Sequence, residues 1–174
     1  MKKLFALLLM LTMVVVFSAC SGVGTGEAQS ADQKSASEEA AAEPEDTSTG
    51  TIGDFEVSIK NYELIQDDEG KDAVFITFDF TNNGEGNANF DTDLYAECFQ
   101  NGVELDFATI YNGERDDSYD NKYKDIQPGT TIEVKEAFLT QDKENPLSVK
   151  VLSMGEIMGG DSEGTVEKEF SITE

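Results

Sequence analysis

Hydrophobic and polar positions alternate with period two along residues 51–174, in short runs separated by turn residues. Apolar side chains at every second position are typical of a strand with one buried face. The run 74–80 has the most apolar face in the chain, with Val, Ile, Phe and Phe at alternate positions, so we expect it to be the central core strand. After Ile59 the alternation resumes at Tyr62 out of step, which predicts a bulge near residues 60–61.

Turn residues divide the runs at three places. Asp-Asp-Glu-Gly at residues 67–70 predicts a tight turn. Asn101-Gly102 lies between expected strands at 94–99 and 103–110, and both turn residues tolerate the positive φ of a type I′ hairpin. Gln127-Pro128-Gly129 has the composition of a type II turn.

Further strands are expected at 132–138, 147–151 and 166–172, with a long polar connection at 112–125 and a glycine-rich loop at 155–164. The total is seven to nine strands with no long helix. We therefore predict an all-β fold, an antiparallel immunoglobulin-like β-sandwich. An up-and-down barrel is the alternative architecture.

The chain begins with a targeting segment that is not part of this fold. Lys2 and Lys3 precede an uncharged stretch of 14 residues, Leu4–Phe17, which is shorter than the about 20 residues that cross a bilayer as a helix. Phe17-Ser18-Ala19-Cys20 resembles a bacterial lipobox, in which the signal peptidase cuts before a cysteine that carries a lipid. We predict a lipoprotein signal peptide at 1–19 and lipidation of Cys20; ordinary secretion with cleavage after Ala19 is the alternative.

Residues 20–50 are rich in Ser, Gly, Ala, Glu and Thr and contain no aromatic residue. Such a segment cannot bury enough apolar surface to offset the entropy of ordering it, so we predict a disordered acidic linker. The predicted organisation is a signal peptide at 1–19, a lipidated cysteine and linker at 20–50, and one sandwich domain at 51–174.

The net charge and the absent residue types exclude several classes of function. The chain has 12 Lys+Arg against 36 Asp+Glu, a net charge of −24, and neither histidine nor tryptophan. Most of the charge lies in residues 51–174, with 9 basic and 29 acidic residues. This balance excludes most nucleic-acid readers, which need clustered Lys and Arg. The absence of histidine removes the usual general base and metal ligand, so we expect neither an enzyme nor a cofactor.

Three segments in this order, 78–83, 99–105 and 125–129, resemble an uncharacterised family of Gram-positive lipoproteins, catalogued as domain of unknown function 5067. Their sequences here are Phe-Asp-Phe-Thr-Asn-Asn, Phe-Gln-Asn-Gly-Val-Glu-Leu and Asp-Ile-Gln-Pro-Gly. The resemblance implies an anchored extracytoplasmic domain with an immunoglobulin-like fold. It implies no catalytic residue.

Calcium is the one metal that the acidic surface suggests, because Ca²⁺ prefers oxygen ligands. If residues 87–93 form a strand, four oxygen-bearing side chains share a face: Asn87, Asn89, Asp91 and Asp93. Asp116 and Asp120 belong to a second cluster, residues 116–121. This cluster lacks the glycine at position six and the glutamate at position twelve of an EF-hand loop. Solvated acidic loops are the simpler interpretation of both clusters.

The polar connection also carries candidates for contact with a protein: Tyr111, Arg115, Tyr119 and Tyr123. Tyr and Arg are enriched at binding hot spots, but tyrosines that pack the edge of the sandwich explain the same pattern. Cys98 alternates with Ala96 and Leu94 on one face, so we interpret it as a buried packing residue without a base to activate it.

The sequence therefore predicts a lipoprotein held at the outer face of the cell membrane, whose non-catalytic domain binds another envelope or extracellular protein. A basic partner is favoured by the charge. The alternative is a Ca²⁺-dependent or small-ligand capture domain that serves an envelope transporter or enzyme.

Overall fold

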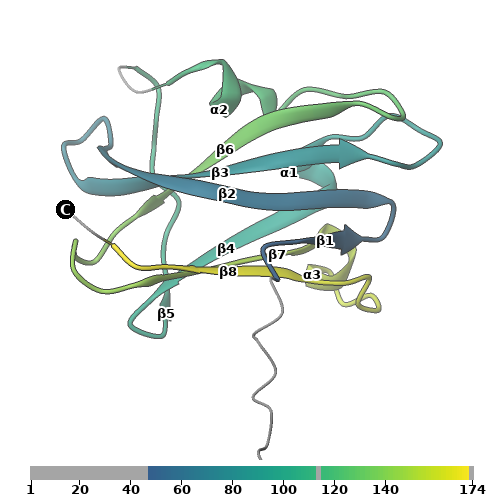
Figure 1. Ribbon diagram of the computed structural model, residues 1–174. Coiled ribbons are helices and arrows are strands. Elements are labelled where there is room, and N and C mark those ends of the chain that lie inside the picture. The colour runs from purple at the N-terminus through teal and green to yellow at the C-terminus, as the bar shows by residue number, and fades with distance from the viewer. Residues whose placement is uncertain (1–46, 113–114, 173–174) are drawn as a thin grey trace, which may run out of the picture. The chain divides into compact units, whose positions relative to one another are not determined.

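Two antiparallel sheets pack face to face in the computed structural model (Figure 1), which describes residues 47–112 and 115–172. The first sheet contains, in spatial order, β1 (Thr49–Ile52), β2 (Phe55–Gln66), β3 (Asp72–Asn82) and β6 (Thr131–Leu139). The second contains β5 (Val103–Glu104), β4 (Leu94–Gln100), β7 (Leu147–Ser153) and β8 (Val166–Phe170). The predicted all-β antiparallel sandwich is confirmed, and the two separate sheets rule out the barrel.

Three short helices lie in the connections: α1 (Phe90–Asp93), α2 (Asp117–Asn121) and α3 (Met154–Ile157). In the described residues, no helix is long and apolar enough to span a membrane. β1 begins at Thr49, before the expected start of the domain at Thr51. The predicted signal peptide, Cys20 and most of the linker lie outside the described residues.

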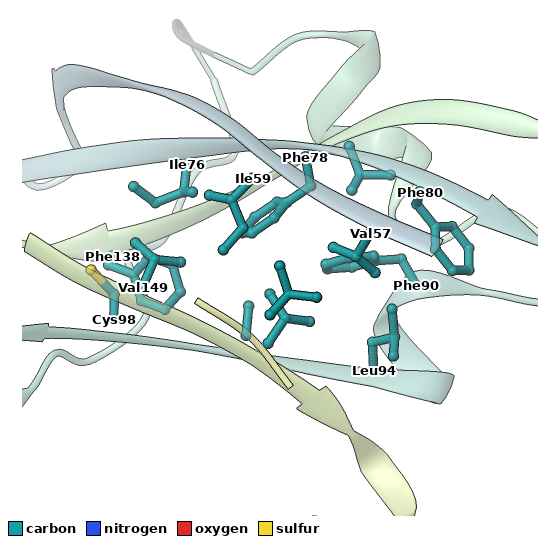
Figure 2. Close-up of a cluster of buried hydrophobic side chains, with 14 of the residues drawn as sticks. Val57, Ile59, Ile76, Phe78, Phe80, Phe90, Leu94, Cys98, Phe138 and Val149 are labelled. Carbon is teal, nitrogen blue, oxygen red and sulfur yellow. The ribbon is translucent and has the colours of Figure 1, made fainter. Parts of the chain in front are cut away.

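The core forms between the inner faces of the two sheets, from the alternating apolar positions that the sequence indicates (Figure 2). Val57 and Ile59 of β2 and Phe78 of β3 are fully or almost fully buried there. The predicted bulge is confirmed, because Ile59 pairs with Phe78 whereas Asn61 pairs with the next residue, Thr77. The extra residue is Lys60, which leaves the alternation of β2 out of step on its two sides.

β3 is buried on both faces, although only one apolar face was expected. Phe75 and Ala73 point to the outer side of the first sheet, opposite the main core. They form a second cluster with Ala108, Ile110 and the ring of Tyr119. We call residues 105–112 and 115–126 the covering segment, because they supply the side chains that remove this outer face from water.

The expected strand at 103–110 is wrong beyond Glu104. β5 pairs only with Phe99 and Gln100 of β4, and the chain then crosses to the other sheet. There Phe107 pairs with Phe138, and the amide of Ala108 donates to the carbonyl of Ala137 at 2.9 Å. Beyond the crossing, Ala108 and Ile110 are buried against the outer face of the first sheet, which removes their apolar surface from water.

The predicted turns are present. Asn101 and Gly102 have φ values of 54° and 76°, as a type I′ hairpin requires. Gly129 has φ 77°, and the amide of Thr130 donates to the carbonyl of Gln127 at 3.1 Å, which closes the type II turn.

Two buried side-chain amides tie these turns to the sheets. The Nδ2 of Asn82 donates to the carbonyls of Gly86 (2.7 Å) and Ile126 (3.1 Å), and its Oδ1 accepts from the amide of Gly84 (3.0 Å). Gln100, at the end of β4, joins the loop between β6 and β7: its Nε2 donates to the carbonyl of Asn145 at 2.9 Å and its Oε1 accepts from the amide of Gln141 at 2.8 Å.

We expect Asn82→Ala to lower the free energy of unfolding by about 2–3 kcal/mol, because it leaves buried backbone groups without partners. The matched control is Asn83→Ala, one residue along the chain and exposed, which should change it by about 0.5 kcal/mol or less. Urea unfolding measures both. Equal midpoints for the two variants would contradict a structural role for the Asn82 amide.

Candidate functional site

The residues of the first predicted calcium cluster do not lie on a strand. Residues 90–93 form α1, and Asn89 caps its N-terminus by accepting from the amide of Asp91 at 3.1 Å. Asp93 in turn accepts from the amide of Asn89 at 2.7 Å. Asn87 is exposed in the loop before α1. The shared face expected for Asn87, Asn89, Asp91 and Asp93 is therefore wrong, because capping favours a helical turn here.

The carboxylates of the second cluster are also already paired with other groups of the protein. Asp116 caps α2 by accepting from the amide of Tyr119 at 2.9 Å, and it accepts from the ammonium of Lys135 at 2.6 Å. Asp120 pairs with the guanidinium of Arg115 at 2.5 Å. Among the described residues, no group of three or more acidic or cysteine side chains is arranged to hold a metal ion.

The four predicted contact residues divide into two kinds. Tyr111 is 72% exposed and Tyr123 is 50% exposed, and Arg115 is exposed beside them. Tyr119 is only 6% exposed, and its ring packs against Phe75 with centroids 5.7 Å apart. Tyr119 thus belongs to the second core cluster and is not available to a partner. For this residue the alternative interpretation, a tyrosine that packs the sandwich, describes the structure.

A buried ion pair lies next to these tyrosines, and the sequence analysis did not identify it. The ammonium of Lys122, just after α2, lies 2.5 Å from Oε1 of Glu136 on β6, and both side chains are buried. The same ammonium lies 4.2 Å from the ring centroid of Tyr119 and 5.0 Å from that of Tyr123. Two aromatic faces and one carboxylate therefore surround a single cation.

Burial and pairing act on this pair in opposite directions. Burial disfavours the ammonium of Lys122, but the neighbouring Glu136 carboxylate outweighs it and raises the lysine pKa. Burial raises the pKa of Glu136, and Lys122 offsets this only in part. Asp91 lies near enough to raise the Glu136 pKa further. The local charge is therefore not neutralised by Lys122 alone.

Two hollows adjoin the ion pair and share Asp91, Phe107 and Glu136 in their walls. One, of about 210 Å³, lies beside Lys122, Tyr119 and Tyr123. The other, of about 240 Å³, reaches β4 at residues 94–96 and the side chain of Met154. We call the two together the groove. Phe107, 46% exposed, lines both hollows and stacks on Phe138 with ring centroids 5.2 Å apart.

A separate hollow of about 570 Å³ lies at the other end of the second sheet, between the β4–β5 hairpin, the loop before β7 and β8. Phe99, Pro146 and Leu147 supply its apolar lining, and Asn101 and Glu169 its polar groups. Its volume falls within the range of about 300–1,000 Å³ that is usual for small-molecule sites.

Cys98 is fully buried in the main core, and this burial raises the pKa of its thiol to about 12. A thiol that stays protonated near neutral pH is a poor nucleophile. The packing role expected for Cys98 is confirmed.

Glu136 is the residue whose position in the sequence pattern could have indicated the groove. It lies at an apolar position of the strand pattern, with Val134 on one side and Phe138 on the other at alternate positions. A buried carboxylate needs a partner, but its partner Lys122 comes from a segment that the pattern describes only as polar.

We expect Lys122→Met to lower the free energy of unfolding by about 3–5 kcal/mol, because Glu136 is left buried without its partner. Adding Glu136→Leu should recover most of the loss. As the matched control, Lys143→Met removes the exposed pair of Lys143 with Asp72, and should cost about 1 kcal/mol or less. Urea unfolding of the four proteins measures these differences.

The loss in Lys122→Met should also depend on pH in one direction. Lys122 lowers the Glu136 pKa, so its removal should raise that pKa further above its already raised value, and the folded variant should bind this proton more tightly than the folded wild type. The deficit should therefore shrink as pH falls from 7 toward about 4.3, the ordinary glutamate value. A deficit that is constant over this range would indicate lost packing rather than an uncompensated charge.

Comparison with known proteins gives a family and a fold. Residues 29–153 match the family described as Domain of unknown function (DUF5067). An NMR structure of a protein from Enterococcus faecalis is similar, with 20% identity and a TM-score of 0.53, over 72% of this chain and 90% of that chain. At this identity the likeness concerns the fold alone. Among curated proteins, none matches the chain.

Proposed function

The chain belongs to the DUF5067 family, and we propose that it is a membrane-anchored extracytoplasmic lipoprotein whose sandwich domain binds another envelope or extracellular protein without catalysis. The observation that carries the proposal is the groove with its exposed aromatic rim. Phe107 and Tyr123 expose large side chains in the walls of the groove, next to a buried charge pair, and Tyr111 is a further exposed aromatic residue of the covering segment. Aromatic side chains beside a partly desolvated charge are typical of protein-binding surfaces.

Anchoring is proposed from the lipobox-like Phe17-Ser18-Ala19-Cys20 and the short apolar stretch before it. A diacylglycerol on Cys20 has two acyl chains, enough for stable attachment. The excess of 29 acidic over 9 basic residues in 51–174 then keeps the domain away from anionic headgroups, so the linker would hold it near the membrane but off its surface.

We also propose that the sandwich is immunoglobulin-like in its topology. The order β2-β3-β6 in one sheet and β5-β4-β7-β8 in the other corresponds to strands A-B-E and C′-C-F-G of that fold, in the same chain order. β1 is then an addition at the edge of the A strand. Loops at the ends of such sandwiches commonly bind partners, but the groove lies along a side of this one.

The alternative function, capture of a small ligand for an envelope transporter or enzyme, is favoured by the hollow of about 570 Å³ at the β4–β5 hairpin. Ca²⁺ dependence of that capture remains a prediction. The two functions differ in what the purified protein retains: native mass spectrometry of the purified chain would detect a small molecule in the second case and none in the first.

Replacing Cys20 by Ser should release the protein from the membrane into the medium, because the lipid has no other attachment point in the predicted signal. Fractionation of cells and medium with detection of the protein measures the release. Cys98→Ser is the control and should leave the protein in the membrane fraction. Continued membrane retention of the Cys20 variant would contradict the anchor.

Crosslinking on intact cells tests the binding function. We expect Tyr111→Ser with Tyr123→Ser to remove a crosslinked partner while the domain stays folded, because both rings are at least half exposed. Only a small fall in melting temperature is expected, from the lost contact of the Tyr123 ring with the Lys122 ammonium. Tyr119 is excluded from the test, since its substitution would damage the second core cluster. Met158→Ser, which removes another exposed apolar side chain that does not line the groove, is the control. An unchanged set of crosslinked proteins would contradict the proposal.

A further inference from the structure

The two hollows of the groove differ in the charges that line them. The hollow of about 210 Å³ has Lys122 in its wall together with Asp91 and Glu136. The hollow of about 240 Å³, which we call the socket, has the same two acidic residues, but Lys122 does not line it. The socket is therefore the part of the groove whose walls carry negative charge without a cation.

Glu136 has one carboxylate oxygen that lacks a donor. Its Oε1 accepts from the ammonium of Lys122 at 2.5 Å and from the amide of Ala137 at 3.1 Å. Within the part of the chain that the structure describes, its Oε2 receives no hydrogen bond. Glu136 is only 8% exposed, and a buried carboxylate oxygen without a donor costs free energy. A donor group that enters the socket would supply the missing hydrogen bond.

Other carboxylates around the socket add to its negative charge. Among the described residues, no Lys or Arg forms an ion pair with the Asp91 carboxylate. Tyr95 also lines the socket, and its pKa is raised by burial and then by Glu104, Glu97 and Glu136. A cation in the socket is therefore attracted by more than one carboxylate.

The size and the other walls of the socket match one long side chain. Its volume of about 240 Å³ is below the about 300 Å³ at which small-molecule sites begin. Phe107 and Tyr95, with ring centroids 6.0 Å apart at 82°, form an aromatic wall, and Phe90, Leu94 and Met154 add apolar surface. Such walls suit the carbon stem of lysine or arginine, whose charged group also binds aromatic faces.

We propose that the socket receives one basic side chain, an arginine or a lysine, from the surface of a partner protein. Its charged group binds Asp91 and Glu136, and its stem packs against Phe107. This inference rests on the proposed binding function and names the residue by which the partner is anchored. A side chain buried in a pocket beside exposed aromatic residues is typical of interface hot spots.

Charge and hydrogen bonding decide between the candidate occupants of the socket. An apolar side chain would cover the Glu136 carboxylate without donating to it. A free amino acid would bring its own carboxylate to two acidic walls. A second copy of this chain would bring a further net charge of −24, which the acidic domain repels. A basic partner protein is attracted by the domain and by the socket, so its association should weaken as salt rises.

Two methionines allow the socket to be observed directly. Residues 20–174, the chain after removal of its predicted signal peptide, contain Met154 in the wall of the socket and Met158, which is 82% exposed and lines neither hollow. The test uses this chain with Cys20→Ser and ¹³C-methyl methionine, and Met158→Ser assigns the two NMR signals. The probe is arginine acetylated at its amino group and amidated at its carboxyl group, so that only the side chain is charged.

We expect the arginine probe to shift the Met154 signal and to leave the Met158 signal nearly in place. A probe of this size should bind in the millimolar range. The same probe made from citrulline, which has the shape of arginine without its charge, should bind about tenfold more weakly.

Two protein variants make the result specific. Asp91→Asn should weaken binding of the arginine probe about tenfold, whereas Asp161→Asn, the same charge change at an exposed position outside the groove, should leave it unchanged. Equal binding of the arginine and citrulline probes overturns the inference, as does a Met154 signal that stays in place at probe concentrations well above the millimolar range.

Crosslinking on intact cells separates the failure of this inference from that of the binding function. There Asp91→Asn should reduce the amount of crosslinked partner, and Asp161→Asn should not. If the partner is lost in the tyrosine variant but kept in Asp91→Asn, the role of the socket is overturned and the binding function stands. If no partner is crosslinked on cells, the binding function itself fails, whatever the probe does.

Discussion

The burial of β3 on both faces is the constraint from which the rest of the structure follows. Its inner face makes the main core with the second sheet, and its outer face carries Phe75 and Ala73. A sheet with apolar residues on its outer side must cover them, since exposed apolar area costs about 25 cal/mol per Å². The covering segment does this with Ala108, Ile110 and Tyr119, and it leaves β4 after β5, which is only two residues long.

The groove results from the way the covering segment packs on the first sheet. Once Tyr119 is seated on Phe75, the end of α2 brings Lys122 over the edge of β6, where Glu136 points inward among apolar neighbours. The pair satisfies two charges that the fold would otherwise bury alone. Because the covering segment crosses from the second sheet to the first, β5 pairs with only two residues of β4. A charge pair and exposed aromatic side chains therefore meet in one place for a single structural reason.

The three segments that resemble the family have structural roles that explain why they occur together. Asn82, in the first, donates to the carbonyl of Ile126 in the third, and the amide of Gly129 donates to the carbonyl of Asn82. Gln100, in the second, holds the loop before β7. These residues determine the ends of the sheets, whereas Lys122 and Phe107 of the groove lie outside all three segments. Both groove residues still lie inside the matched residues 29–153, so membership of the family covers the scaffold and the groove alike and does not by itself identify a partner.

The sequence by itself determined the local structure: the alternating strands, the bulge at Lys60, the Asn101-Gly102 hairpin, the turn at Gly129 and the buried Cys98. Each depends on residues close together in the chain, through strand periodicity or through the φ angles that Asn, Gly and Pro allow. The prediction from sequence was wrong at residues 87–93, where Asn89 caps a helical turn in place of the expected strand. It was also wrong at 105–110, where the expected strand ends at Glu104. Only the tertiary structure decided that Tyr119 is buried, that Lys122 meets Glu136 across 14 residues of sequence, and that β5 pairs with only two residues of β4. These depend on how a covering segment packs on a distant sheet, and contacts between elements leave no periodicity in either one.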